Sequence, residues 1–141
     1  MPTYHGSPVA GLQQVYPSPS PVLHGEAAVF GTPNRTAAAL FSQRWSNDDF
    51  QFGAYGNRYY LKEMYKGAFR RKLAGKSGSV YTVSGLFRKD SRLPSFERVS
   101  SEPVKVLREE RVDDILQMLK ASPIHLRKYQ QAVTSAPIVE Q

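Results

Sequence analysis

Apolar residues occur in short stretches along this chain, separated by segments rich in glycine, proline and polar residues. Residues 27–30 are apolar throughout, which is typical of a short buried strand. Residues 59–64 and 79–83 contain the β-branched and aromatic residues that favour strands. Residues 98–107 predict another extended segment, and residues 3–5 predict a short extended start.

Two segments carry the pattern of a helix. We expect Thr32 to cap a helix that has Pro33 at its first position and runs to about Gln43, because proline suits a position where the amide hydrogen is unpaired. The second helix has apolar residues at i, i+3, i+4 and i+7, namely Val112, Ile115, Leu116 and Leu119. Asp113 and Asp114 should lie in its first turn, where the helix dipole favours acids.

The remaining segments predict loops and define the fold class. Residues 6–26 are rich in glycine, proline and serine, and a long loop of this kind is often functional, for instance as a flap over a ligand. Residues 46–58 and 88–95 are polar connections. The order of elements predicts an α+β fold with a mainly antiparallel sheet and few short helices. We expect a single domain over residues 1–130 and a flexible tail over 131–141.

Composition narrows the class of protein. The chain has 141 residues, of which 40% are hydrophobic and 22% charged, as expected for one globular domain with a modest core. It has no cysteine, which excludes disulfides, thiolate metal sites and a cysteine nucleophile. The three histidines are scattered, so the sequence predicts no metal site. The absence of a long apolar run or a signal-like start predicts a soluble, cytoplasmic protein without membrane contact.

The charge of the chain favours acidic partners. The formal net charge is +7 and the pI about 9.8, a balance that suits nucleic acid or nucleotide phosphates. The positive charge is concentrated in Arg70, Arg71, Lys72, Lys76, Arg88, Lys89 and Arg92. A solvated basic region without any partner is the alternative interpretation.

Three short segments suggest chemistry at a nucleotide sugar. His5 beside Gly6 can bind ribose hydroxyls while bare backbone approaches a base. Phe30 offers a flat apolar surface, and Glu102 offers a carboxylate that stabilises positive charge at the anomeric carbon. The alternatives are a turn histidine for His5, a core residue for Phe30 and a solvated strand face for Glu102.

Residues 4–7, 29–38 and 101–106, in this order, resemble the ADP-ribosyltransferase superfamily, in particular its His-Tyr-Glu branch of poly(ADP-ribose) polymerase and diphtheria-toxin type. The resemblance implies an ADP-ribosyltransferase-like split sheet and NAD as substrate. It also implies Glu102 and His5 as catalytic residues. The residues that it implies for nucleotide binding are His5, Gly6, Ser7, Phe30 and Thr32.

The chain departs from the pattern of that family in one respect. The family tyrosine falls at Val29 or Phe30, and neither has a hydroxyl group, although Phe30 can still stack on a nicotinamide ring. Other acids compete with Glu102 for the role of the carboxylate, namely Glu97, Glu109 and Glu110.

The resemblance implies an NAD-dependent ADP-ribosyltransferase that moves ADP-ribose to a protein or nucleic-acid acceptor. One alternative keeps the fold but changes the reaction to that of the NAD-using RNA 2′-phosphotransferases. Another is a non-catalytic basic module that binds nucleic acid or protein through exposed aromatic and cationic side chains.

Overall fold

A computed structural model describes residues 2–56 and 58–130, so the tail expected over 131–141 lies outside the described residues. None of the helices in this part of the chain is long and apolar enough to cross a membrane. The elements, in chain order, are β1 (Thr3–Ser7), β2 (Gln14–Val15), β3 (Ser18–Pro19), η1 (Pro21–Leu23), β4 (Ala27–Gly31), α1 (Arg35–Phe41), β5 (Phe50–Tyr55), β6 (Arg58–Glu63), α2 (Ala68–Lys72), β7 (Gly78–Ser84), β8 (Arg98–Ser100), β9 (Val104–Val112), α3 (Ile115–Lys120) and β10 (Ile124–Arg127).

The described residues form three small sheets whose strands pair mostly antiparallel. Their strand orders are β1-β7-β9-β2, β3-β4-β8 and β10-β6-β5. Within the third sheet, β10 runs parallel to β6. Tyr4 and Thr32 exchange two backbone hydrogen bonds, with N···O distances of 2.8 and 2.9 Å, which join β1 to the residue after β4. The predicted α+β class, with mainly antiparallel sheets and few short helices, is therefore confirmed.

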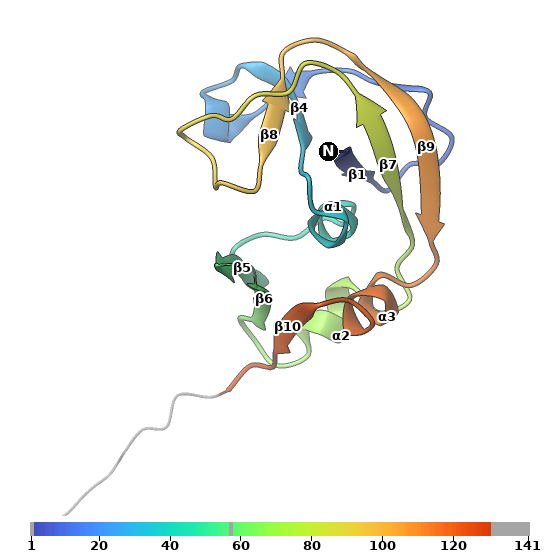
Figure 1. Ribbon diagram of the computed structural model, residues 1–141. Helices are drawn as coiled ribbons and strands as arrows, with labels where there is room; N and C mark the ends of the chain where they lie inside the picture. The colour runs from blue at the N-terminus through green and yellow to red at the C-terminus, as the bar shows by residue number, and fades with distance from the viewer. Residues whose placement is uncertain (1, 57, 131–141) are drawn as a thin grey trace, which may run out of the picture.

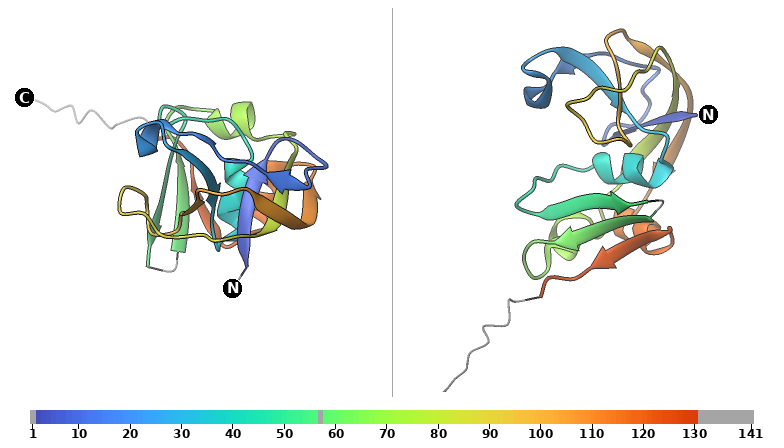
Figure 2. Two further views of the ribbon diagram at one scale, coloured as in Figure 1. Left: turned by 90° about the horizontal axis from the view of Figure 1, so that it is seen from above. Right: turned by 60° about the vertical axis from the view of Figure 1, so that its left-hand side comes forward.

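Helix α1 lies between two parts of the molecule (Figure 1). One part contains β1, β4, β7, β8 and β9, and the other contains β5, β6, β10, α2 and α3. The right-hand view of Figure 2 shows the same arrangement, with α1 in cyan between the two parts. The buried residues of α1 are Ala37, Ala38, Ala39 and Leu40. Because alanine side chains are small, the helix can approach the backbone of its neighbours closely.

The apolar positions of the second predicted helix, Ile115, Leu116 and Leu119, lie in the core. The largest cluster joins α1, α3 and the β5–β6 hairpin, and its fully buried members include Leu40, Phe50, Leu61, Leu73, Ile115 and Leu119. A second cluster packs on the first sheet and comprises Val15, Val29, Tyr81, Val83 and Val104. Tyr81 is completely buried there, in the strand that residues 79–83 predicted.

Four segments differ from the sequence-based prediction. The loop expected over residues 6–26 contains the short strands β2 and β3 and the 3-10 helix η1. Residues 46–58, expected to be a polar connection, contain strand β5 at the edge of its sheet. At its start, buried Phe50 is followed by exposed Gln51, the alternation of apolar and polar residues typical of a strand. Arg70, Arg71 and Lys72, for which the sequence predicted no element, lie in the short helix α2. The single extended segment 98–107 is two strands, β8 and β9, separated by a bend at residues 101–103. Pro103 lies in this break. Proline has no amide hydrogen, but no strand hydrogen bond is lost here, because the residue pairs with no strand.

The start of α1 differs from the prediction by two residues. Asn34 is the N-cap, and its side-chain oxygen accepts a hydrogen bond from the Ala37 amide at 2.8 Å. Thr32 is therefore not the cap; its Oγ1 accepts a hydrogen bond from the Asn34 amide at 3.1 Å and stabilises the turn before the helix. The helix ends at Phe41, slightly earlier than expected.

Helix α3 also begins later than its apolar spacing predicted. Asp114 is its N-cap rather than a residue of the first turn, and it accepts a hydrogen bond from the Gln117 amide at 3.2 Å. Val112 ends β9, so the first position of the helical pattern belongs to a strand. Val112 is nevertheless buried with Ile115, because both side chains join the same cluster.

Candidate functional site

A pocket lies where β1, the end of β4, α1 and the residue before β8 meet. Its volume is about 260 Å³. Its walls are formed by Tyr4, His5, Gly6, Phe30, Gly31, Thr32, Ala38, Phe41 and Glu97. The pocket therefore combines apolar and aromatic walls with one imidazole and one carboxyl group, the composition typical of small-molecule sites.

His5 is fixed by a hydrogen bond across the pocket wall. Its Nδ1 lies 2.7 Å from the carbonyl oxygen of Phe30. Because a carbonyl oxygen only accepts, Nδ1 must carry the proton of this bond. Burial lowers the pKa of His5, and the bond to Phe30 opposes that shift only in part. The neutral ring thus keeps Nε2 as a hydrogen-bond acceptor, which can accept the proton of a hydroxyl group.

Gly6 has a structural reason to be glycine. A Cβ atom at this position would overlap the carbonyl oxygen of Ala38 and would lie only 2.8 Å from the backbone nitrogen of Ser42. Both obstacles are backbone atoms of α1 and its C-terminal cap, which cannot move as a flexible side chain can. The packing of β1 on α1 therefore requires glycine, independently of any ligand.

Glu97 supplies the carboxyl group of the pocket. Its side chain is half-buried, and this desolvation raises the pKa of Glu97. Within residues 2–56 and 58–130, no hydrogen bond or ion pair reaches its carboxylate. A desolvated acid without a cationic partner favours a ligand that carries or develops positive charge.

Phe96 holds the segment that carries Glu97. Its ring contacts Phe52 at a centroid distance of 5.1 Å and Tyr59 at 5.8 Å. It also stacks on Phe41, a wall of the pocket, at 6.3 Å. This aromatic cluster connects the loop before β8 with α1 and with the β5–β6 hairpin, and it thereby positions Glu97 beside the pocket.

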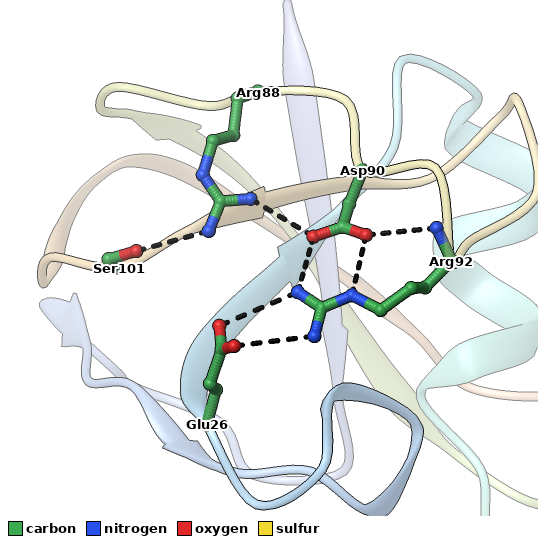
Figure 3. Close-up of polar contacts among 5 residues, drawn as sticks. All are labelled: Glu26, Arg88, Asp90, Arg92 and Ser101. Atoms are coloured by element: carbon green, nitrogen blue, oxygen red, sulfur yellow. Dashed lines mark hydrogen bonds and ion pairs between the residues drawn. The ribbon is translucent and has the colours of Figure 1, made fainter.

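The loop that contains Glu97 is closed at its base. Arg88 and Val99 exchange two backbone hydrogen bonds of 2.9 Å each. Within the loop, Asp90 accepts hydrogen bonds from the Arg92 side chain, and Arg92 also reaches Glu26 at 3.3 Å (Figure 3). These arginine contacts hold the pKa of Asp90 well below its ordinary value. The network fastens the loop to the residue before β4.

The structure brings together four of the predicted site residues, His5, Gly6, Phe30 and Thr32. Ser7, the fifth residue expected to bind nucleotide, is buried, and its Oγ accepts a hydrogen bond from the Val9 amide at 3.1 Å. Ser7 does not line the pocket.

Glu102 does not lie where the sequence suggested. It is exposed in the bend between β8 and β9, so its assignment to a strand is wrong, and it does not line the pocket. The Ser100 hydroxyl donates to the Glu102 carbonyl at 2.9 Å and accepts from its amide at 3.2 Å, which stabilises the bend. The expected convergence of His5, Phe30 and Glu102 is not observed; Glu97, one of the competing acids, takes that position.

The other competing acids have partners elsewhere. Glu110 forms a bidentate ion pair with Arg35, in which Nε donates at 2.7 Å. The Glu109 carboxylate accepts from Ser79 at 2.5 Å and from the Gly11 amide at 3.1 Å, and these bonds lower its pKa. Both contribute to packing between segments and neither lines the pocket.

No group of three or more histidine, aspartate or glutamate side chains in the described part of the chain could hold a metal ion. No family model matches the chain, and neither a curated protein nor a solved structure matches it. The pocket chemistry and the resemblance of the two N-terminal segments, residues 4–7 and 29–38, are therefore the basis for a functional proposal.

Proposed function

We propose that the pocket binds the nicotinamide riboside end of NAD, and that the protein is an ADP-ribosyltransferase with the corresponding fold. The observation that carries this proposal is the pairing of a neutral His5 with a half-buried carboxyl group, Glu97, on opposite segments of one aromatic-walled pocket. The order of the N-terminal segments, with His5-Gly6 in the first strand and Phe30 before a small-residue helix, supports the same family.

The size of the pocket suits part of a dinucleotide. At about 260 Å³ it lies just below the range for drug-sized ligands, so it accommodates a ring and its sugar rather than all of NAD. Phe30 and Phe41 offer apolar surface to the nicotinamide ring. The Nε2 atom of His5 accepts a hydrogen bond from a ribose hydroxyl.

The carboxylate provides the electrostatic part of catalysis. When the bond between ribose and nicotinamide breaks, its electron pair leaves with the nicotinamide nitrogen and positive charge develops on the ribose. A carboxylate at Glu97 stabilises that charge, as in glycoside cleavage. An acceptor nucleophile then adds to the anomeric carbon and loses its proton. We assign this role to Glu97 rather than Glu102, because Glu97 lines the pocket.

A binding experiment tests the ligand. NAD at about 100 times its Kd should stabilise the wild-type protein by roughly 2.7 kcal/mol in a thermal shift assay, and His5→Ala should reduce this shift. NADH is the matched control, because its dihydronicotinamide ring is neutral whereas the ring of NAD is cationic. We expect the uncompensated Glu97 carboxylate to favour NAD. A wild-type protein that shows no shift with NAD would contradict the proposal.

A turnover experiment tests the carboxylate. Release of nicotinamide from NAD should fall on the order of 10²–10³-fold in Glu97→Gln, the loss typical of a single electrostatic contact in a transition state. Glu102→Gln is the control: it removes an exposed carboxylate at the other end of β8, outside the pocket, and should retain activity. The reverse result, with Glu102 essential and Glu97 dispensable, would support the original assignment to Glu102 and reject the one proposed from the pocket.

A further inference from the structure

A second hollow, separate from the pocket of His5 and Glu97, lies beside the ends of β1, α1 and α2. Its volume is about 340 Å³. The residues that line it are Pro8, Ser42, Gln43, Arg44, Arg71, Lys72 and Lys76. Four of these residues are cations, and they come from segments that are distant in the sequence. We name this feature the basic hollow.

The cations of the basic hollow exceed the nearby acids. Lys72 Nζ lies 3.7 Å from a carboxylate oxygen of Asp49, a contact that contributes to lowering the pKa of Asp49. Arg71 lies near the same carboxylate. Arg44 and Lys76 form no ion pair within residues 2–56 and 58–130. Four cations and one carboxylate leave a formal charge of +3 around one concave surface.

A purely structural explanation covers only some of these charges. Basic residues in the last turn of a helix stabilise its dipole, which accounts for Arg71 and Lys72 at the end of α2. Arg44 and Lys76 lie beyond the ends of α1 and α2, outside the turns that the dipole affects. Their position around the hollow indicates a site for an anionic ligand.

We propose that the basic hollow binds phosphate groups along a nucleic-acid strand. Arginine binds phosphate with paired donors and lysine as a point charge, and both types are present. The exposed large apolar side chains, such as Leu86, Leu107 and Tyr55, do not line the hollow, whereas membrane binding uses apolar insertion beside cations. The concave shape and the net charge of +7 both favour a strand of phosphodiesters.

The test is fluorescence anisotropy with labelled single-stranded RNA and DNA of about 12 nucleotides, using the full chain at about 50 mM salt. The variant Arg44→Gln/Lys76→Gln removes two charges of the basic hollow. Its matched control, Lys105→Gln/Arg108→Gln, removes one lysine and one arginine from the exposed surface of β9. We expect affinity to fall about 10-fold or more in the first variant and less than about 3-fold in the control.

Salt dependence and competing ligands provide independent readouts. Loss of two phosphate contacts to a single strand should reduce the slope of log affinity against log salt by about 1.4. Equal losses in both variants, or no binding of either nucleic acid by the wild type, would overturn the proposal. The proposal would also be overturned if Arg44→Gln/Lys76→Gln weakened binding to phosphatidylserine vesicles or to a polyglutamate peptide but left nucleic-acid binding unchanged. This proposal does not depend on NAD binding at the pocket of His5 and Glu97. The thermal shift with NAD, measured on the same variants, therefore separates a failure of the basic hollow from a failure of the NAD site.

Discussion

The substitution Gly6→Ala tests the close approach of β1 and α1. In the structure, the added methyl carbon would overlap the carbonyl oxygen of Ala38 and would lie 2.8 Å from the backbone nitrogen of Ser42. Gly6 pairs with Val80 in the sheet, so β1 cannot retreat from the helix without breaking that register. Either the helix or the strand must shift, and both border the pocket of His5 and Glu97.

The expected loss of stability is large for one methyl group. Overpacking of a core costs about 1–3 kcal/mol, and occasionally more, when side chains can adjust. At Gly6 the obstacles are backbone atoms, so we expect about 3 kcal/mol or more. This is a substantial part of the roughly 5–15 kcal/mol by which domains are stable. At about 4 °C per kcal/mol, the melting temperature should fall by about 12 °C or more.

Urea unfolding and thermal melting of Gly6→Ala measure this loss. Gly11→Ala is the control, because Gly11 has φ +80° and no heavy atom within 4 Å of an added Cβ. Left-handed backbone alone should cost that variant about 1–2 kcal/mol. If Gly6→Ala loses no more than Gly11→Ala, the contact between β1 and α1 does not explain the glycine, and a ligand-binding role for its backbone gains support.

Substitutions at three further residues, each compared with a control variant, test the helix cap, the carboxyl group and the aromatic cluster. Asn34→Ala should cost about 1 kcal/mol in chemical unfolding, while Asn34→Asp retains an acceptor for the Ala37 amide and should cost much less. Burial raises the folded-state pKa of Glu97 above its ordinary 4.5, so stability falls as pH rises through that folded-state pKa. Glu97→Gln should therefore melt higher than wild type at about pH 8 but not at about pH 4, and the exposed-site control Glu102→Gln should melt like wild type at both. Phe96→Ala should cost about 2 kcal/mol, and Phe96→Leu less than half of that, because the leucine keeps most of the apolar volume.

The N-terminal half of the candidate site could be predicted because its signals are local. His5 precedes a glycine in a short strand, and Phe30 ends an apolar run before a helix, so neighbouring residues alone define both positions. The sequence does not show which residue begins the first helix, because Thr32 and Asn34 are both good caps. Asn34 is the cap because its oxygen reaches the Ala37 amide, while Thr32 is used in the preceding turn.

The position of Glu97 could not be read from the sequence. It depends on Phe96, whose partners Phe41, Phe52 and Tyr59 lie far away along the chain. It depends also on the pairing of Arg88 with Val99, which closes the loop at its base. Glu102 offered the stronger local signal, an acid within an extended segment, but the bend before Pro103 removes it from the sheet.

Among the pocket residues, Glu97 is the one whose presence packing explains least. Gly6 is required by the contact with α1, and the neutral ring of His5 makes a hydrogen bond to Phe30 that supports the fold. Glu97 is desolvated, which disfavours its charged form, and no cation compensates it within the described residues. Residues that oppose stability in this way are concentrated at functional sites, because their interaction with a ligand offsets the cost. Under the proposed function, the cationic nicotinamide ring of NAD is the group that compensates this carboxylate, which a neutral or anionic ring would not do.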